Sequence, residues 1–111
     1  MKGSNLGEFE EVVLLTVASL DNRTYSVAVV DKLSEQINRK VKLGVVHAIL
    51  ARLEKKGYLK SEMGEPTMTR GGKRKRFYSL TTSGFAAVNK SREIRQQLWN
   101  TIPKLVIEKL K

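Results

Sequence analysis

Residues 43–57 have the sequence LGVVHAILARLEKKG, in which large apolar side chains recur at helical spacing. This spacing predicts a helix from about Leu43 to Lys56 that ends at Gly57. The face expected to meet the core consists of Leu43, Val46, Ile49, Leu50 and Leu53. The opposite face is a nearly bare row made of Gly44, Ala48, Ala51 and Lys55, with Val45, His47 and Arg52 on its shoulders.

A helix face this bare lets the backbone come close to a partner. The major groove of DNA admits a helix and exposes the base edges, so such a face suits base recognition. Small residues serve equally well where two helices pack. The basic neighbours Lys42, Arg52 and Lys55 favour DNA, and we predict that substitution of His47 or Arg52 changes which sequences are bound.

Two further helices are predicted before this one. The first, from about Leu6 to Leu20, is apolar on almost every side between Val12 and Ala18, as expected of a helix that is covered all round. In so short a chain we expect one face to meet the core and another to meet a partner subunit; coverage by its own domain alone stays open. The second helix follows a turn at residues 21–24 and runs from about Tyr25 to Asn38, with an apolar stripe of Val27, Val30, Leu33 and Ile37.

A β-hairpin with a long basic connection is predicted after the third helix. Residues 58–63 and 76–80 have strand character, and we expect Tyr78 and Leu80 to face inward. The connection is too long for a tight turn and is strongly basic, with Arg70, Lys73, Arg74 and Lys75. Such a loop suits phosphate contacts, because Lys and Arg gain affinity by releasing counterions.

The last predicted helix is long and apolar mainly at its two ends. It runs from about Thr82 to Ile102, with Thr81 as its N-cap, and Pro103 ends or kinks it. A helix of this length projects beyond a small domain, so we expect its distal end to contact a second chain. A final apolar patch follows, consisting of Leu105, Val106, Ile107 and Leu110.

Charge is concentrated in the middle of the chain. The 111 residues carry a net charge of +10, and residues 39–76 hold twelve basic side chains against three acidic ones. Such asymmetry indicates a binding surface for a polyanion, with nucleic acid ahead of an anionic membrane.

Composition excludes several classes of site. With no cysteine and a single histidine, the chain has no disulfide, thiolate zinc site or multi-histidine metal site, and we expect neither a cofactor nor an enzymatic activity. His47, on a basic shoulder, is expected to contact DNA rather than to catalyse. The N-terminus differs from a signal peptide and the run from Val12 to Leu20 is too short to span a bilayer, so we expect a cytoplasmic protein.

The predicted order of helix, helix, helix, strand, basic loop, strand and helix is that of a winged helix-turn-helix, a mainly α fold with a two-stranded β wing. The chain resembles more specifically the PadR family of bacterial regulators. Four stretches carry the resemblance: Leu6-Gly7-Glu8-Phe9-Glu10, Tyr25, residues 43–46 followed by 50–57, and residues 77–84. Any one of them is weak alone, whereas all four in order form a strong signal.

The resemblance implies a homodimeric repressor that binds a palindromic operator through the third helix and the wing. Residues 1–81 would form the DNA-binding domain and residues 82–111 a C-terminal dimerisation helix. The DNA contacts implied by charge, spacing and resemblance are Tyr25, Lys42, Gly44, Val45, His47, Ala48, Arg52, Lys55, Arg70, Lys73, Arg74 and Lys75. The implied dimer interface consists of Leu6, Phe9, Val13, Leu98, Trp99 and Ile102.

Three positions qualify the resemblance. His47 replaces a usual tyrosine, which puts any inherited operator sequence in doubt, and Ser26 replaces a frequent glycine. Some family members bind planar aromatic compounds between tryptophans of the dimer, and Trp99 lies about one turn after that position. Trp99 is therefore either a ligand contact or a packing residue.

A winged-helix module that binds RNA or another protein is the alternative function. Sequence-specific RNA binding usually stacks unpaired bases on aromatic side chains. Phe77 and Tyr78 have no second aromatic strand beside them, which favours duplex DNA.

Overall fold

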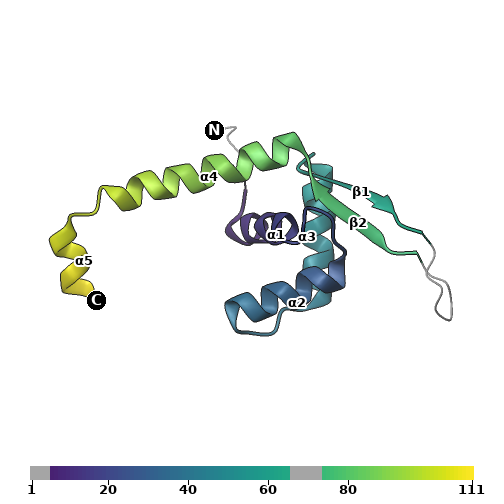
Figure 1. Cartoon of the computed structure of the whole chain (residues 1–111), viewed down its shortest axis with the longest axis horizontal. Coiled ribbons are helices and arrows are strands. Elements are labelled where there is room, and N and C mark those ends of the chain that lie inside the picture. Colours follow the sequence, from purple (N-terminus) through teal and green to yellow (C-terminus); the bar gives the residue numbers. More distant parts are fainter. Residues whose placement is uncertain (1–5, 66–73) are drawn as a thin grey trace.

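The computed structural model describes residues 6–65 and 74–111. Its elements in chain order are α1 Glu8–Ser19, α2 Ser26–Ile37, α3 Leu43–Lys55, β1 Leu59–Met63, β2 Arg76–Leu80, α4 Thr82–Asn100 and α5 Lys104–Leu110. Figure 1 shows α1, α2 and α3 gathered in one body, from which the hairpin leaves on one side and α4 on the other. The predicted winged-helix order is confirmed.

The helices begin and end where local chemistry requires. The Glu10 carboxylate accepts a hydrogen bond from the backbone N–H of Gly7 at 2.7 Å, which caps the start of α1. Asn38 ends α2 in the left-handed region with φ of 55°. Gly57, with φ of 83°, allows the chain to turn after α3, as predicted.

The hairpin is antiparallel and gains a third partner from the turn before α2. Leu59 pairs with Leu80 and Met63 with Arg76. On its other edge, β2 forms a bridge in which the N–H of Tyr78 donates to the carbonyl of Thr24 at 2.7 Å. Tyr78 and Leu80 are buried, which confirms their predicted orientation.

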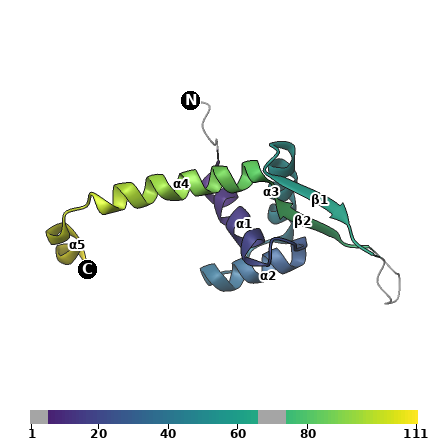
Figure 2. The same ribbon diagram turned by 45° about the horizontal axis from the view of Figure 1, so that its top comes forward.

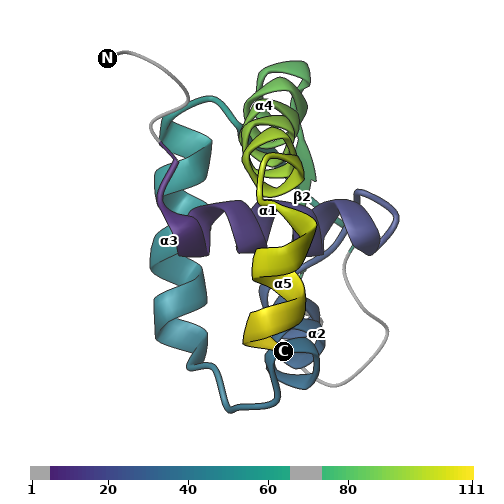
Figure 3. The same ribbon diagram turned by 90° about the vertical axis from the view of Figure 1, so that its left-hand side faces the viewer.

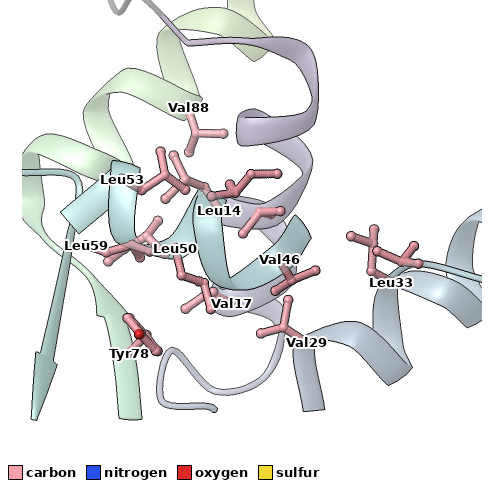
Figure 4. Packing of buried hydrophobic residues seen from close by; sticks show 14 residues of the cluster. Leu14, Val17, Val29, Leu33, Val46, Leu50, Leu53, Leu59, Tyr78 and Val88 are labelled. Carbon is pink, nitrogen blue, oxygen red and sulfur yellow. The ribbon is translucent and has the colours of Figure 1, made fainter. Parts of the chain in front are cut away.

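The core lies where α1, α2 and α3 meet the base of the hairpin (Figure 4). Each fully buried aliphatic side chain there stabilises the fold by about 1.5–3 kcal/mol. The labelled core residues are Leu14, Val17, Val29, Leu33, Val46, Leu50, Leu53, Leu59, Tyr78 and Val88.

Two predicted core positions are wrong. Leu43 is exposed because the core covers α3 only from Val46 onward. Val27 is also exposed, and Val29 takes its place on the core face with Leu33 four residues later. Two positions separate Val27 from Val29, so the two side chains project from roughly opposite sides of α2.

α4 starts as part of the body and then leaves it. Thr81 is its N-cap as predicted, because its hydroxyl accepts from the N–H of Gly84 at 3.0 Å. Gly84, Ala87 and Val88 are buried, whereas every residue from Arg92 to Asn100 is exposed. Figure 2 shows this outer part, which we call the arm together with α5, extending away from the other helices.

Pro103 separates α4 from α5, as predicted, although α4 ends at Asn100 rather than at Ile102. In Figure 3 the arm points toward the viewer and α1 crosses behind it, beside α3. α1 contacts α2, α3, β2 and α4, so it lies at the centre of the body.

Candidate nucleic-acid interface

The bare row on α3 faces away from the core. Gly44, Ala48, Ala51 and Lys55 are all exposed, while Val46, Ile49, Leu50 and Leu53 fix the opposite side of the helix in the core. A Cβ built on Gly44 would meet nothing within 4 Å. The backbone of α3 is therefore accessible along this row, as entry into a major groove requires.

The two shoulders of α3 face different neighbours. On the wing side, Glu54 accepts from the hydroxyl of Ser61 at 2.7 Å, and Ser61 in turn accepts from Arg76 at 2.9 Å. On the α1 side, Arg52 lies 3.6 Å from the Glu10 carboxylate. His47 belongs to the wing side and Arg52 to the α1 side; the sequence did not indicate which element each shoulder faces.

A basic hollow lies between α2, α3 and the root of the wing, and we call it the wing cleft. Its volume is about 510 Å³. Its lining consists of Tyr25, Ser26, Val27, His47, Arg74, Lys75, Arg76 and Tyr78. Four predicted DNA contacts, Tyr25, His47, Arg74 and Lys75, therefore come together from three different elements.

Aromatic rings and cations pack together beside the wing cleft. The rings of Tyr25 and Phe77 meet edge to face, with centroids 5.9 Å apart. The ammonium of Lys75 lies 4.0 Å from the Tyr25 centroid, and the guanidinium of Arg23 lies 3.9 Å from the Phe77 centroid. Sequence reasoning missed Arg23 and Phe77, although aromatic residues flanked by basic ones in β2 are a signal for such stacking.

Gly64 forms two hydrogen bonds at the root of the wing. Its N–H donates to the carbonyl of Lys75 at 2.7 Å, and its own carbonyl accepts from Nε of Arg74 at 2.7 Å. A side chain at this position would collide with the ring of Phe77. Of the predicted wing contacts, Arg74 and Lys75 are thus held at the cleft, whereas Arg70 and Lys73 lie outside the described residues.

Two buried carboxylates connect α1 to its neighbours. Glu10 pairs with Lys56 at 2.9 Å and with Arg52 at 3.6 Å, and Glu11 pairs with Arg95 of α4. Burial of Glu10 opposes its ionisation, but the Gly7 N–H, Lys56 and Arg52 outweigh burial, so its pKa lies below the ordinary value. Neither carboxylate was singled out from the sequence, because the partners are distant along the chain.

Comparison with known families decides what kind of protein carries this interface. A family model described as the transcriptional regulator PadR-like family matches residues 14–90, more than half of the chain. The chain belongs to this family. Its members regulate transcription, so the PadR-like chain is a transcriptional regulator that acts by binding DNA.

Solved structures share the fold of this PadR-like chain. A PadR family regulator from Eggerthella lenta is 23% identical, with a TM-score of 0.67 and coverage of 89% of this chain and 86% of the other. A PadR-like regulator from Bacillus cereus is 16% identical, with a TM-score of 0.69 and coverage of 88% and 90%. RosR from H. salinarum is 20% identical, with a TM-score of 0.70 and coverage of 96% and 90%. A search of curated proteins found no match.

The residues predicted for dimerisation fall into exposed and buried sets. Leu98 and Trp99 are 63% and 57% exposed on the arm. Leu6, Phe9 and Ile102 are half-buried. Val13 has no exposed surface and packs in the core of its own chain, so its assignment to the interface is wrong. The exposed apolar residue of this part of α1 is Leu15.

Neither a metal-ion cluster nor a membrane-spanning helix is present in the part of the chain that the structure describes. Within residues 6–65 and 74–111, no group of three His, Asp or Glu side chains could hold a metal ion. Among the same residues, none of the helices is long and apolar enough to cross a membrane. Of the remaining predicted DNA contacts with long side chains, Lys55 lies on the bare row of α3, and Lys42, just before α3, lines a different hollow with Phe9 and Val45.

Proposed function

We propose that this PadR-like regulator is a homodimeric repressor that binds a palindromic operator. The observation that carries the proposal is the bare row of α3 directly beside the basic wing cleft, with His47 of the cleft on the shoulder of the row. In a two-fold dimer, the two α3 helices would enter successive major grooves about 34 Å apart.

The parts of this surface differ in what they would contact. Gly44, Val45 and Ala48 bring the backbone of α3 close to the bases, and His47 is the polar side chain placed to distinguish them. Lys42, Lys55 and the cations of the wing cleft would bind phosphates, which fix the position of the protein without selecting sequence.

Selection of bound sequences from random duplex DNA tests the proposal. We expect enrichment of an inverted repeat whose half-sites are centred about 10 bp apart or a multiple of that. Single-stranded RNA is expected to compete poorly. Failure to enrich any duplex sequence, or equal competition by RNA, would contradict the proposal. Reporter expression with and without the protein then distinguishes repression from activation.

The arm is proposed to hold the dimer together through Leu98 and Trp99. Truncation of a residue at an interface centre costs about 2 kcal/mol or more, so Leu98→Ala/Trp99→Ala should weaken dimerisation by more than about 30-fold. Sedimentation equilibrium measures the effect. Gln97→Ala, an exposed polar position on the same turn, is the control and should leave the dimer intact. An unchanged mass for the double variant would place the interface elsewhere.

We further propose that a planar aromatic ligand binds near Trp99 and loosens DNA binding. A two-fold dimer through the arm would bring two exposed indoles close together. Because the chain has a single Trp, titration of flat aromatic compounds should quench its fluorescence directly. A bound compound must also lower operator affinity to act as an effector, since only differential affinity for two states shifts their populations. No quenching across a varied panel would leave Trp99 as a packing residue.

A further inference from the structure

A buried carboxylate lies between α1 and the DNA-facing helix. The Glu10 side chain is only 6% exposed, and its Oε1 lies 2.9 Å from Nζ of Lys56. Its Oε2 lies 3.1 Å from the same ammonium and 3.6 Å from Nη1 of Arg52. The N–H of Gly7 donates to Oε1 at 2.7 Å and fixes the carboxylate independently of both cations. Glu10 is therefore held rigidly, while the Arg52 side chain remains 57% exposed.

The two cations lie on one side of the bare row of α3. Arg52 follows Ala51 and Lys56 follows Lys55, so each lies about 100° around the helix from the row, on the side of α1. From this shoulder their long side chains reach toward the phosphates beside a groove that holds α3, which makes Arg52 a phosphate contact in this inference rather than the sequence-determining contact predicted from the sequence. Among the described residues, Lys55, on the row itself, forms no ion pair.

The neighbouring carboxylate shows that burial at this end of α1 does not itself require partners from α3. Glu11 is buried to the same extent as Glu10, and its partner is Arg95 of α4. The two acids differ in the element that supplies the cation. Only Glu10 engages positive charge of the helix that carries the bare row.

We propose that Glu10 is a specificity-determining residue, which competes with DNA phosphates for Arg52 and Lys56 and so suppresses sequence-independent binding. This inference rests on the DNA contact through α3 proposed above. Phosphate contacts strengthen binding to every sequence, whereas regulation depends on the ratio of operator to random affinity. A chain with a net charge of +10 gains specificity when cations near its base-contacting helix are internally paired.

The test compares Glu10→Gln with the wild-type protein on random duplex DNA. Glutamine keeps an oxygen that accepts from Gly7, so the start of α1 stays capped. Loss of the Glu10 charge beside Arg52 and Lys56 should steepen the dependence of log affinity on log salt by about 1 to 2, because each phosphate contact contributes about 0.9. Random-DNA affinity at low salt should rise about fivefold to tenfold. Operator affinity should rise less, since base contacts fix the position of α3, and the specificity ratio should fall.

Glu11→Gln is the matched control. It removes the same charge from the same helix but frees only Arg95 on α4, so its salt slope should stay near that of the wild type. Arg52→Gln should cancel much of the gain when it is combined with Glu10→Gln, a coupling that a double-mutant cycle measures. In the presence of Glu10, Arg52→Gln should flatten the slope less than Lys55→Gln does, a comparison that does not need Glu10→Gln to fold.

Two outcomes separate this inference from the function on which it rests. If wild-type protein binds duplex DNA specifically but Glu10→Gln and Glu11→Gln have equal slopes, the role of Glu10 is overturned and the proposed function stands. If the wild-type protein binds no duplex sequence in preference to RNA, the proposed function fails and the role of Glu10 fails with it.

Discussion

Gly84→Ala should destabilise the protein by about 3 kcal/mol, at the upper end of the usual cost of overpacking. Gly84 is buried in the first turn of α4, where a Cβ would collide with the backbone carbonyl of Tyr58. That carbonyl also accepts from the N–H of Thr81 at 3.1 Å, so it cannot turn away without the loss of a hydrogen bond. In a domain of this size, the melting temperature should fall by more than about 10 °C. Thermal unfolding followed by circular dichroism measures the shift.

Gly44→Ala is the matched control, with the same change in another helix. Gly44 has open space around its Cα, so alanine should stabilise α3 by up to about 1 kcal/mol through its better helix propensity. The two substitutions should therefore shift the melting temperature in opposite directions. A fall for both would mean that general helix effects, rather than the contact with Tyr58, decide the result at Gly84.

The ends of the helices were predictable from the sequence because they depend on single residues. Gly57 and Thr81 mark helix ends because a left-handed φ and a capping hydroxyl are properties of single residues. Burial along α2 and α3 was less predictable. Leu43 and Val27 have apolar side chains at helical spacing, yet Leu43 lies before the part of α3 that the core covers, and Val27 projects from the far side of α2. The part of a helix that the core covers depends on where the neighbouring elements lie. The periodicity within one helix carries no information about those neighbours.

Most residues of the candidate site were predictable from the sequence, but which of them lie together in space was not. His47 and Arg52 are five residues apart and so lie on opposite shoulders of the bare row, but only the structure shows that His47 faces the wing and Arg52 faces α1. The ion pair of Glu10 was not predictable from the sequence because its cationic partner Lys56 is 46 residues away in the chain. Val13 was wrongly assigned to a partner interface, since an all-round apolar helix is equally well explained by neighbours within one chain.

Removal of the two wing-root charges should weaken all DNA binding. In Arg74→Gln/Lys75→Gln, the loss of two phosphate contacts should lower the salt slope by about 2, with similar losses for operator and random DNA. The loss of affinity should be on the order of tenfold or more at moderate salt. Filter binding or fluorescence anisotropy across a salt series measures both quantities. Lys104→Gln/Lys109→Gln removes the same charge from α5 and should change the slope much less.

His47→Ala is the complementary change, because it alters a side chain beside the bare row and leaves the formal charge of the protein unchanged. Loss of a good base contact costs about 1–3 kcal/mol of discrimination at one base pair, so one position of the selected half-site should become degenerate while the salt slope stays constant. Lys75 and His47 line the same cleft, and their expected effects nonetheless differ in kind. Lys75 carries its charge on the wing above the ring of Tyr25, whereas His47 projects from α3, the helix proposed to meet the bases. A wing variant that altered sequence preference with an unchanged salt slope would show that the wing, rather than α3, contacts base edges.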